Sequence, residues 1–85
     1  MMTLDRARLV AFLTDQFSLR EDELADGTKL FSTGLLDSFN LVDLVGFLER
    51  EGKFKMGAME VNLENLDTIE RIVRFFGSKT ASKTG

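Results

Sequence analysis

Cysteine, histidine, proline, tryptophan and tyrosine are all absent from this chain of 85 residues. Without cysteine the chain has no disulfide, no thiolate nucleophile and no sulfur ligand for a metal. Without histidine it also lacks the usual general base near neutral pH and the commonest metal ligand. A Ser-His-Asp triad and a zinc-hydrolase site are therefore excluded within the chain. We expect neither a catalytic site nor a metal site, so any reactive group that this chain uses has to come from outside.

The chain also lacks a long apolar run, and its charge is mostly of one sign. No apolar stretch approaches the roughly 20 residues that span a bilayer, and the N-terminal sequence does not have the pattern of a signal peptide. We therefore expect a cytoplasmic protein without membrane insertion. The net charge is −3, and between Asp15 and Glu49 eight acidic residues stand against two basic ones, Arg20 and Lys29. Because this charge repels nucleic acid and attracts basic surfaces, we expect protein partners and no nucleic acid.

The remaining composition is typical of one small helical domain. Hydrophobic residues make up 44% of the chain and charged residues 29%, as in an ordinary globular protein. Apolar residues recur with helical spacing in three segments, which predicts helices over 4–17, over 37–52 and from about residue 67 onward. Thr3 is the expected N-cap of the first of these helices.

The second helix has the clearest pattern. Asp37 is its expected N-cap, and Gly52 is its expected stop. Its buried stripe is predicted to contain Leu41, Leu44, Val45 and Leu48, widened by Val42.

The segments between and after the predicted helices are expected to differ in structure. Residues 18–36 hold too many apolar side chains for a free linker, so an ordered and functional loop that crosses the core is expected. Residues 53–65 could form a strand or a short helical turn around 57–61, and we favour the turn because no partner strand is visible. Residues 78–85 are small and polar, which predicts a disordered tail after a single domain over 1–77.

Ser38 opens the second helix directly behind an acid and after a glycine-containing loop. Its hydroxyl is expected to be exposed, next to free backbone N–H groups and the positive end of the helix dipole, where a phosphate ester is favoured. Phe39 falls on the side opposite the buried stripe and indicates a contact surface. A plainer interpretation stays open, in which Asp37 and Ser38 are only a helix cap.

The stretch around Ser38 resembles the acyl carrier and peptidyl carrier protein family. The residues that carry the resemblance run from Leu30 to Phe39 (LFSTGLLDSF), and the helix Leu41-Val42-Asp43-Leu44-Val45 follows them. The family signature is a glycine, two residues, Asp-Ser and an apolar residue before an amphipathic acidic helix. The resemblance covers about residues 4–76. It implies an all-α four-helix bundle with a long first loop and a short third helix.

The resemblance also implies roles for the residues of this motif. In the family, the serine that matches Ser38 receives 4′-phosphopantetheine from coenzyme A, and the thiol of this arm holds the cargo as a thioester. Asp37 is then the acid beside the attachment site, which caps the helix and helps the transferase to engage. Partner contacts fall on Phe39, Val42, Asp43 and Gly46. A solvated helix face is the plainer interpretation of Asp43.

Some residues of this chain differ from those usual at the same positions in the carriers of ordinary fatty-acid synthesis. Arg50 interrupts the acidic second helix, and Gly46 and Phe47 are unusual at partner-facing positions. Phe39 stands where many members have leucine. The sequence Leu-Asp-Ser-Phe is closer to stand-alone carriers of amino acids, such as D-alanyl carrier proteins, and to specialised acyl carriers.

The prediction is a monomeric, non-enzymatic carrier of acyl or aminoacyl thioesters. Its expected partners are a phosphopantetheinyl transferase, an acyl- or aminoacyl-loading ligase, and a downstream synthase or acyltransferase. The alternative is a helical protein-interaction module without a prosthetic group. Met56 and Met59 could border a flexible cargo cleft, although core filling is the preferred interpretation for both.

Overall fold

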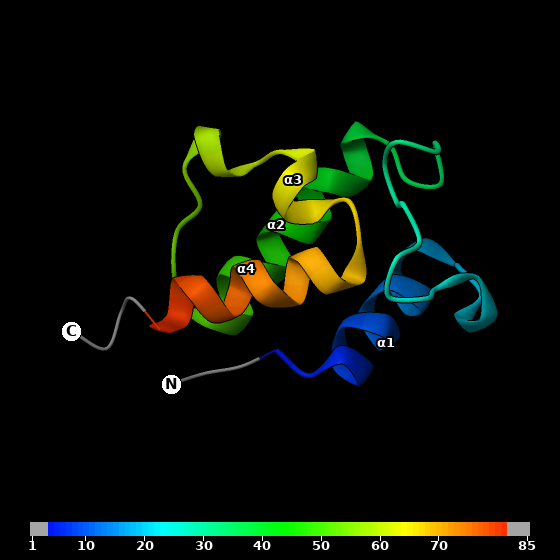
Figure 1. Cartoon of the computed structure of the whole chain (residues 1–85), viewed down its shortest axis with the longest axis horizontal. Coiled ribbons are helices and arrows are strands. Elements are labelled where there is room, and N and C mark those ends of the chain that lie inside the picture. The colour runs from blue at the N-terminus through cyan, green and yellow to red at the C-terminus, as the bar shows by residue number, and fades with distance from the viewer. Residues whose placement is uncertain (1–3, 82–85) are drawn as a thin grey trace.

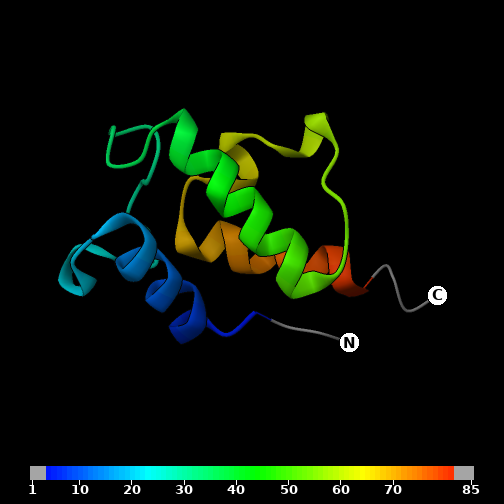
Figure 2. The ribbon, with the colours of Figure 1, turned by 180° about the vertical axis from the view of Figure 1, so that it is seen from behind.

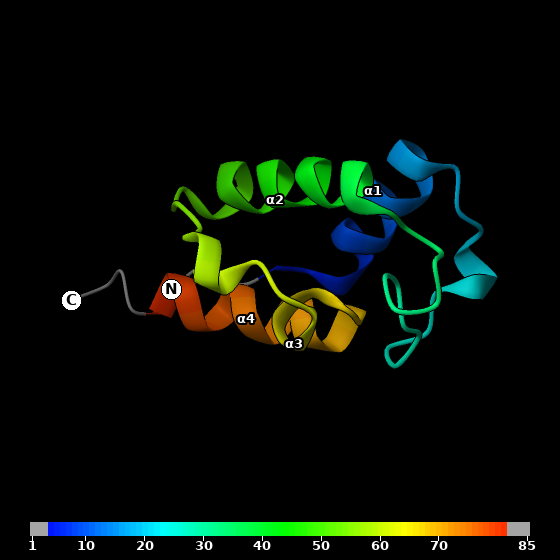
Figure 3. The ribbon, with the colours of Figure 1, turned by 90° about the horizontal axis from the view of Figure 1, so that it is seen from above.

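A computed structural model describes residues 4–81, and these residues form the all-α fold that the sequence predicts. Figure 3 shows two layers, with α2 in one layer, α3 and α4 in the other, and α1 toward one end. Figure 1 shows the molecule from the α4 side, and Figure 2 shows it from the α2 side. Within residues 4–81, no helix has the length and apolar character needed to cross a membrane. The elements in chain order are α1 (Arg6–Phe17), a 3₁₀ turn (Glu21–Glu23), α2 (Ser38–Gly52), a second 3₁₀ turn (Ala58–Glu60), α3 (Leu63–Leu66) and α4 (Ile69–Ala81).

The core lies between the two layers and draws on every long helix. Each large apolar side chain that is fully buried contributes about 1.5–3 kcal/mol relative to an exposed one. The connection between α1 and α2 supplies buried leucines as well, which confirms that it is an ordered segment crossing the core. The fully buried side chains include Leu9, Leu13, Leu30, Leu44, Leu48, Leu66, Ile69, Ile72 and Phe76.

Helix α1 begins later than its apolar pattern suggests. Its N-cap is Asp5, whose carboxylate accepts a hydrogen bond of 3.0 Å from the N–H of Ala7. The expected cap, Thr3, lies outside the described residues, and the prediction that it caps α1 is wrong because Asp5 occupies that role. Helix α1 is joined to α2 by a stack of Phe12 on Phe47, with ring centroids 4.0 Å apart.

Helix α2 has the bounds that the sequence predicts, but two details differ. Val42 is 70% exposed and does not widen the buried stripe, whereas Phe47 is buried. Gly52 is the last helical residue and not the left-handed stop, which is Lys53 with φ of 54°. Gly52 is needed for another reason, because a Cβ there would lie 2.2 Å from the ring of Phe54.

The segment between α2 and α4 contains the predicted turn and one helix more. The turn is the 3₁₀ helix Ala58–Glu60, and the short third helix that the resemblance implies is α3. Asn62 is the N-cap of α3, since its side-chain oxygen accepts a hydrogen bond of 2.9 Å from the N–H of Asn65. This helix is only four residues long. It could not be recognised from a helical period, because the apolar residues of this segment alternate.

Helix α4 extends past the predicted domain boundary to Ala81. Thr80 is buried and its hydroxyl donates a hydrogen bond of 3.1 Å to the carbonyl of Phe76. Lys79 forms an ion pair of 3.0 Å with Glu60. The predicted disorder from Ser78 is therefore wrong for residues 78–81, and the rest of that predicted tail lies outside the described residues.

Candidate functional site

Ser38 is the first residue of α2, and its side chain is exposed. Among the hydrogen bonds of residues 4–81, none involves its hydroxyl. A free and exposed hydroxyl at this position is accessible to a modifying enzyme.

Asp37 and Asn40 cap the helix end next to Ser38. One carboxylate oxygen of Asp37 accepts hydrogen bonds of 3.0 Å from the N–H groups of Phe39 and Asn40. In return, the side-chain oxygen of Asn40 accepts a bond of 2.9 Å from the N–H of Asp37. The expectation of free N–H groups at this end is therefore wrong for the two that Asp37 occupies.

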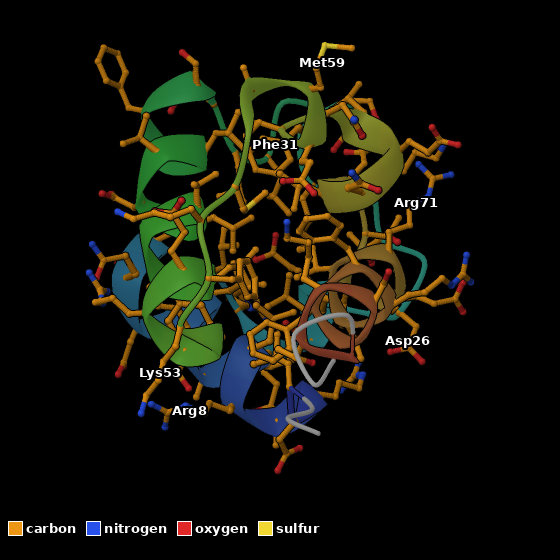
Figure 4. All side chains as sticks on the ribbon, turned by 90° about the vertical axis from the view of Figure 1, so that its left-hand side faces the viewer. Arg8, Asp26, Phe31, Lys53, Met59 and Arg71 are labelled. Carbon is orange, nitrogen blue, oxygen red and sulfur yellow. The ribbon has the colours of Figure 1, made fainter. Side chains whose placement is uncertain are left out.

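An apolar groove of about 370 Å³ adjoins Ser38 on one side of α2. Figure 4 shows the ring of Phe31 between α2 and α3. The walls of the groove come from α2, from the preceding loop and from the region of α3, and its apolar residues are Phe31, Leu36, Leu41, Val61, Leu63 and Leu66. The lining of this groove could not be predicted from the sequence, because its walls are far apart along the chain and each residue in them looks like a core residue.

Neither methionine proposed for a cargo cleft lines this groove. Met56 packs partly buried against the core, as core filling predicts. Met59 is 90% exposed and points outward in Figure 4, so core filling is wrong for this residue.

Asp67 ties the loop before Ser38 to the α3–α4 corner. It is only 2% exposed, and one carboxylate oxygen accepts bonds of 2.8 Å and 3.1 Å from the N–H groups of Phe31 and Ser32. Its other oxygen accepts a bond from the Ser32 hydroxyl, and its carbonyl accepts one of 2.7 Å from the N–H of Leu30. This carboxylate therefore fixes Phe31, which forms one wall of the groove.

The hydrogen bonds of Asp67 also set its protonation. Burial alone raises the pKa of the Asp67 carboxyl, since it disfavours the charged form. The bonds from Ser32 and from the N–H of Phe31, with the nearby charge of Lys29, act in the opposite direction and outweigh burial. The pKa of Asp67 is therefore below its ordinary value, and the group is a carboxylate near neutral pH.

The residues expected to contact partners lie on the outer face of α2, apart from the groove. Phe39 is 82% exposed, Val42 and Asp43 are also exposed, and Gly46 is half-buried. The structure thus brings Ser38 and Asp37 together at the helix start and sets this face beside them. Within residues 4–81, no group of three or more aspartate or glutamate side chains could hold a metal ion.

Comparison with known proteins gives one informative match. The chain is 34% identical over 68 residues to the probable acyl carrier protein PigG of Serratia sp. (strain ATCC 39006), a match that covers 79% of this chain and 78% of that protein. No protein-family model matches the chain.

Proposed function

This chain belongs to the acyl carrier protein family, and from that premise we propose that Ser38 carries a 4′-phosphopantetheine arm whose thiol holds acyl or aminoacyl groups as thioesters. The protein then acts as a carrier and not as an enzyme. Its partners are the phosphopantetheinyl transferase, a loading ligase, and a downstream synthase or acyltransferase.

The observation that carries this proposal is the exposed hydroxyl of Ser38 at the start of α2, next to an apolar groove of about 370 Å³. A chain without cysteine or histidine has no thiol or imidazole of its own. An arm with a thiol supplies the missing reactive group, and an apolar groove near its attachment point is suited to shield an apolar cargo from water.

In the attachment step, the hydroxyl oxygen of Ser38 attacks the phosphorus atom of coenzyme A that bears the pantetheine unit. A phosphate ester bond to Ser38 forms, the pyrophosphate bond of coenzyme A breaks, and adenosine 3′,5′-bisphosphate leaves. The hydroxyl proton passes to a base of the transferase. Asp37 fixes the helix start through its two accepted hydrogen bonds and so positions Ser38 for this reaction.

The test is to incubate the protein with coenzyme A and a phosphopantetheinyl transferase and to measure its mass. We expect a gain of one phosphopantetheine unit in the wild type and no gain in Ser38→Ala. Ser32→Ala serves as a second control and should gain the same mass as the wild type. Ser32 is also exposed, but its hydroxyl donates a hydrogen bond to Asp67. No gain in the wild type, or an equal gain in Ser38→Ala, would contradict the proposal and would favour a helical interaction module without a prosthetic group.

A specialised acyl or aminoacyl cargo fits the residues around the site better than a general fatty-acid role. Phe39 is 82% exposed beside Ser38, and Arg50 introduces a positive charge on the exposed side of α2. Loading tests with a set of acyl- and aminoacyl-activating ligases would identify the class of cargo.

A further inference from the structure

The groove beside Ser38 ends at a wall that separates it from the core. Two of its lining residues, Leu36 and Leu66, are only 3% and 1% exposed and belong to the core as well. Phe31 is half-buried, lines the groove and packs against the same core. Its ring lies between α2 and α3 (Figure 4). A cargo that passed from the groove into the core would therefore have to displace buried leucines or the ring of Phe31.

The backbone of Phe31 is held on both sides. Its N–H donates a hydrogen bond of 2.8 Å to the carboxylate of Asp67, and the N–H of Ser32 donates one of 3.1 Å to the same oxygen. The carbonyl of Phe31 accepts a bond of 3.0 Å from the N–H of Gly34, and the N–H of Leu30 donates one of 2.7 Å to the carbonyl of Asp67. The loop cannot move the Phe31 ring aside without breaking some of these bonds. Because the core behind it is close-packed, we treat this wall as rigid.

The volume of the groove sets the size of what it can shield. It is about 370 Å³. At roughly 30 Å³ for each group of the size of a water molecule or a methylene, this volume holds on the order of ten such groups. A longer chain would leave its end in water, since the Phe31 wall closes the way into the core.

The lining of the groove is almost uncharged. Among the described residues that line it, only Asp37 carries a charge, and Ser38 and Asn62 are the other polar ones. The side chain of Asn62 is already engaged, because it accepts a bond of 2.9 Å from the N–H of Asn65 and donates one of 2.9 Å to the carbonyl of Met59. A carboxylate at the far end of a cargo would be buried there without a cation and beside a like charge, which costs free energy. The groove therefore favours a cargo with an uncharged, apolar end.

We propose that Phe31 is a specificity-determining residue, which ends the cargo groove before the core and limits the shielded cargo to short apolar acyl or aminoacyl groups of up to about ten non-hydrogen atoms. Long fatty chains and groups that end in a carboxylate are not shielded. The inference rests on the proposed function, because the cargo reaches the groove only on an arm attached at Ser38.

The test measures the thermal unfolding midpoint of the protein loaded with straight-chain acyl groups from acetyl to palmitoyl. Acyl-coenzyme A in place of coenzyme A delivers arm and cargo together, and the mass of the product confirms loading. A cargo seated in the groove interacts with the folded chain alone and so raises the midpoint. We expect a rise of about 1–3 °C for each carbon up to about ten carbons, because the open groove buries only part of each methylene, and a plateau beyond that length. Succinyl should raise the midpoint less than butyryl, which has the same number of carbons.

Two substitutions at Phe31 test what ends the groove. Removing the phenyl ring in Phe31→Ala leaves space for about three more carbons, so the plateau should begin at a longer chain. Phe31→Val should move it by about half as much, and it keeps a larger apolar side chain in place if Phe31→Ala folds poorly. Phe75→Ala is the matched control, since Phe75 is also half-buried against the core but belongs to α4 and is not among the groove's lining residues. It should lower every midpoint and leave the length at the plateau unchanged.

The length at which the plateau begins decides the proposal, because general destabilisation does not change it. A wild-type midpoint that kept rising up to palmitoyl, or that did not rise with chain length at all, would overturn the limit. A plateau at the same length in the wild type and in the folded Phe31 variants would also overturn it, and so would equal midpoints with succinyl and butyryl. Attachment at Ser38 would be intact in all of these cases. If the wild type gained no mass from any acyl-coenzyme A, the proposed function itself would fail.

Discussion

At the scale of single residues, Asp67 is the buried group on which the candidate site most depends. Its carboxylate accepts hydrogen bonds from two N–H groups and one hydroxyl of the loop before Ser38. Asp67→Asn keeps one acceptor oxygen but turns an amide NH₂ toward donors, so it should lower the free energy of unfolding by about 1–3 kcal/mol. Urea unfolding checks this, with the exposed Asp15→Asn as control, for which a change within about 0.5 kcal/mol is expected. Equal stability of the two variants would contradict this role.

The same carboxylate gives a prediction about pH. Because the pKa of Asp67 is lower in the folded chain than in the unfolded chain, its stabilisation is fully present above the unfolded value of about 3.9 and is lost as the pH falls through the folded pKa. The stability difference between the wild type and Asp67→Asn should therefore be constant near neutral pH and shrink below about pH 4. Urea unfolding across this range measures it. A difference that grew in acid would contradict the lowered pKa.

The residues of the site differ in how far the sequence revealed them. Asp37 and Ser38 could be predicted because a cap and the residue after it are local features of the chain. Asp67 could not, because the donors it serves lie 35 and 36 positions away. Asp67 lies just before the start of α4, and in sequence a buried carboxylate that holds a loop in place looks the same as an ordinary capping acid.

At the scale of elements, helix α2 ends where the sequence predicts, but for a different physical reason. The sequence predicts Gly52 as the stop of the helix, but the residue that leaves the helix in a left-handed conformation is Lys53, with φ of 54°. Gly52 instead makes room for Phe54, which lies against Phe76 in the core with ring centroids 5.6 Å apart. The distinction depends on a tertiary contact that sequence spacing does not contain.

Substitutions at these two neighbouring positions should have opposite effects. Lys53→Gly removes about 1–2 kcal/mol of left-handed backbone strain from the folded chain. It also raises the conformational entropy of the unfolded chain, which costs about 0.4–1 kcal/mol of stability. The net result is a gain in the free energy of unfolding of roughly 0.5 kcal/mol. Gly52→Ala should cost about 1–3 kcal/mol, because its Cβ overlaps the Phe54 ring. Thermal unfolding of both variants tests the assignment, and a stabilising Gly52→Ala would refute it.

Helix α3 marks the limit of periodicity as a guide. Its four residues, Leu63–Leu66, are too few to show a helical repeat, and its cap Asn62 follows a segment of alternating apolar residues. Packing against α4 determines its conformation. Since Leu63 and Leu66 line the groove beside Ser38, the part of the site that was missed is also the part that tertiary contacts create.

At the scale of the whole molecule, the folded unit extends beyond the boundary that composition suggests. Residues 78–85 are small and polar, yet Thr80 is 3% exposed and Lys79 joins α4 to Glu60. Lys79 also lies 5.7 Å from the centroid of the Phe54 ring. The last turn of α4 therefore closes one end of the core, where α2 has just ended. Small polar residues obscured this role because their partners come from the segment after α2.

Shortening the chain tests where the folded unit ends. A chain that stops at Gly77 loses Thr80, with its bonds to the carbonyls of Phe76 and Gly77, and also loses Lys79 above the Phe54 ring. Compared with a chain that stops at Ala81, it should unfold with a free energy lower by about 1–3 kcal/mol, because buried contacts are removed at one end of the core. Ser78→Ala in the full chain is the control, since Ser78 is exposed and a change within about 0.5 kcal/mol is expected. If the two shortened chains were equally stable, the last turn of α4 would contribute nothing, and the boundary at residue 77 would be correct after all.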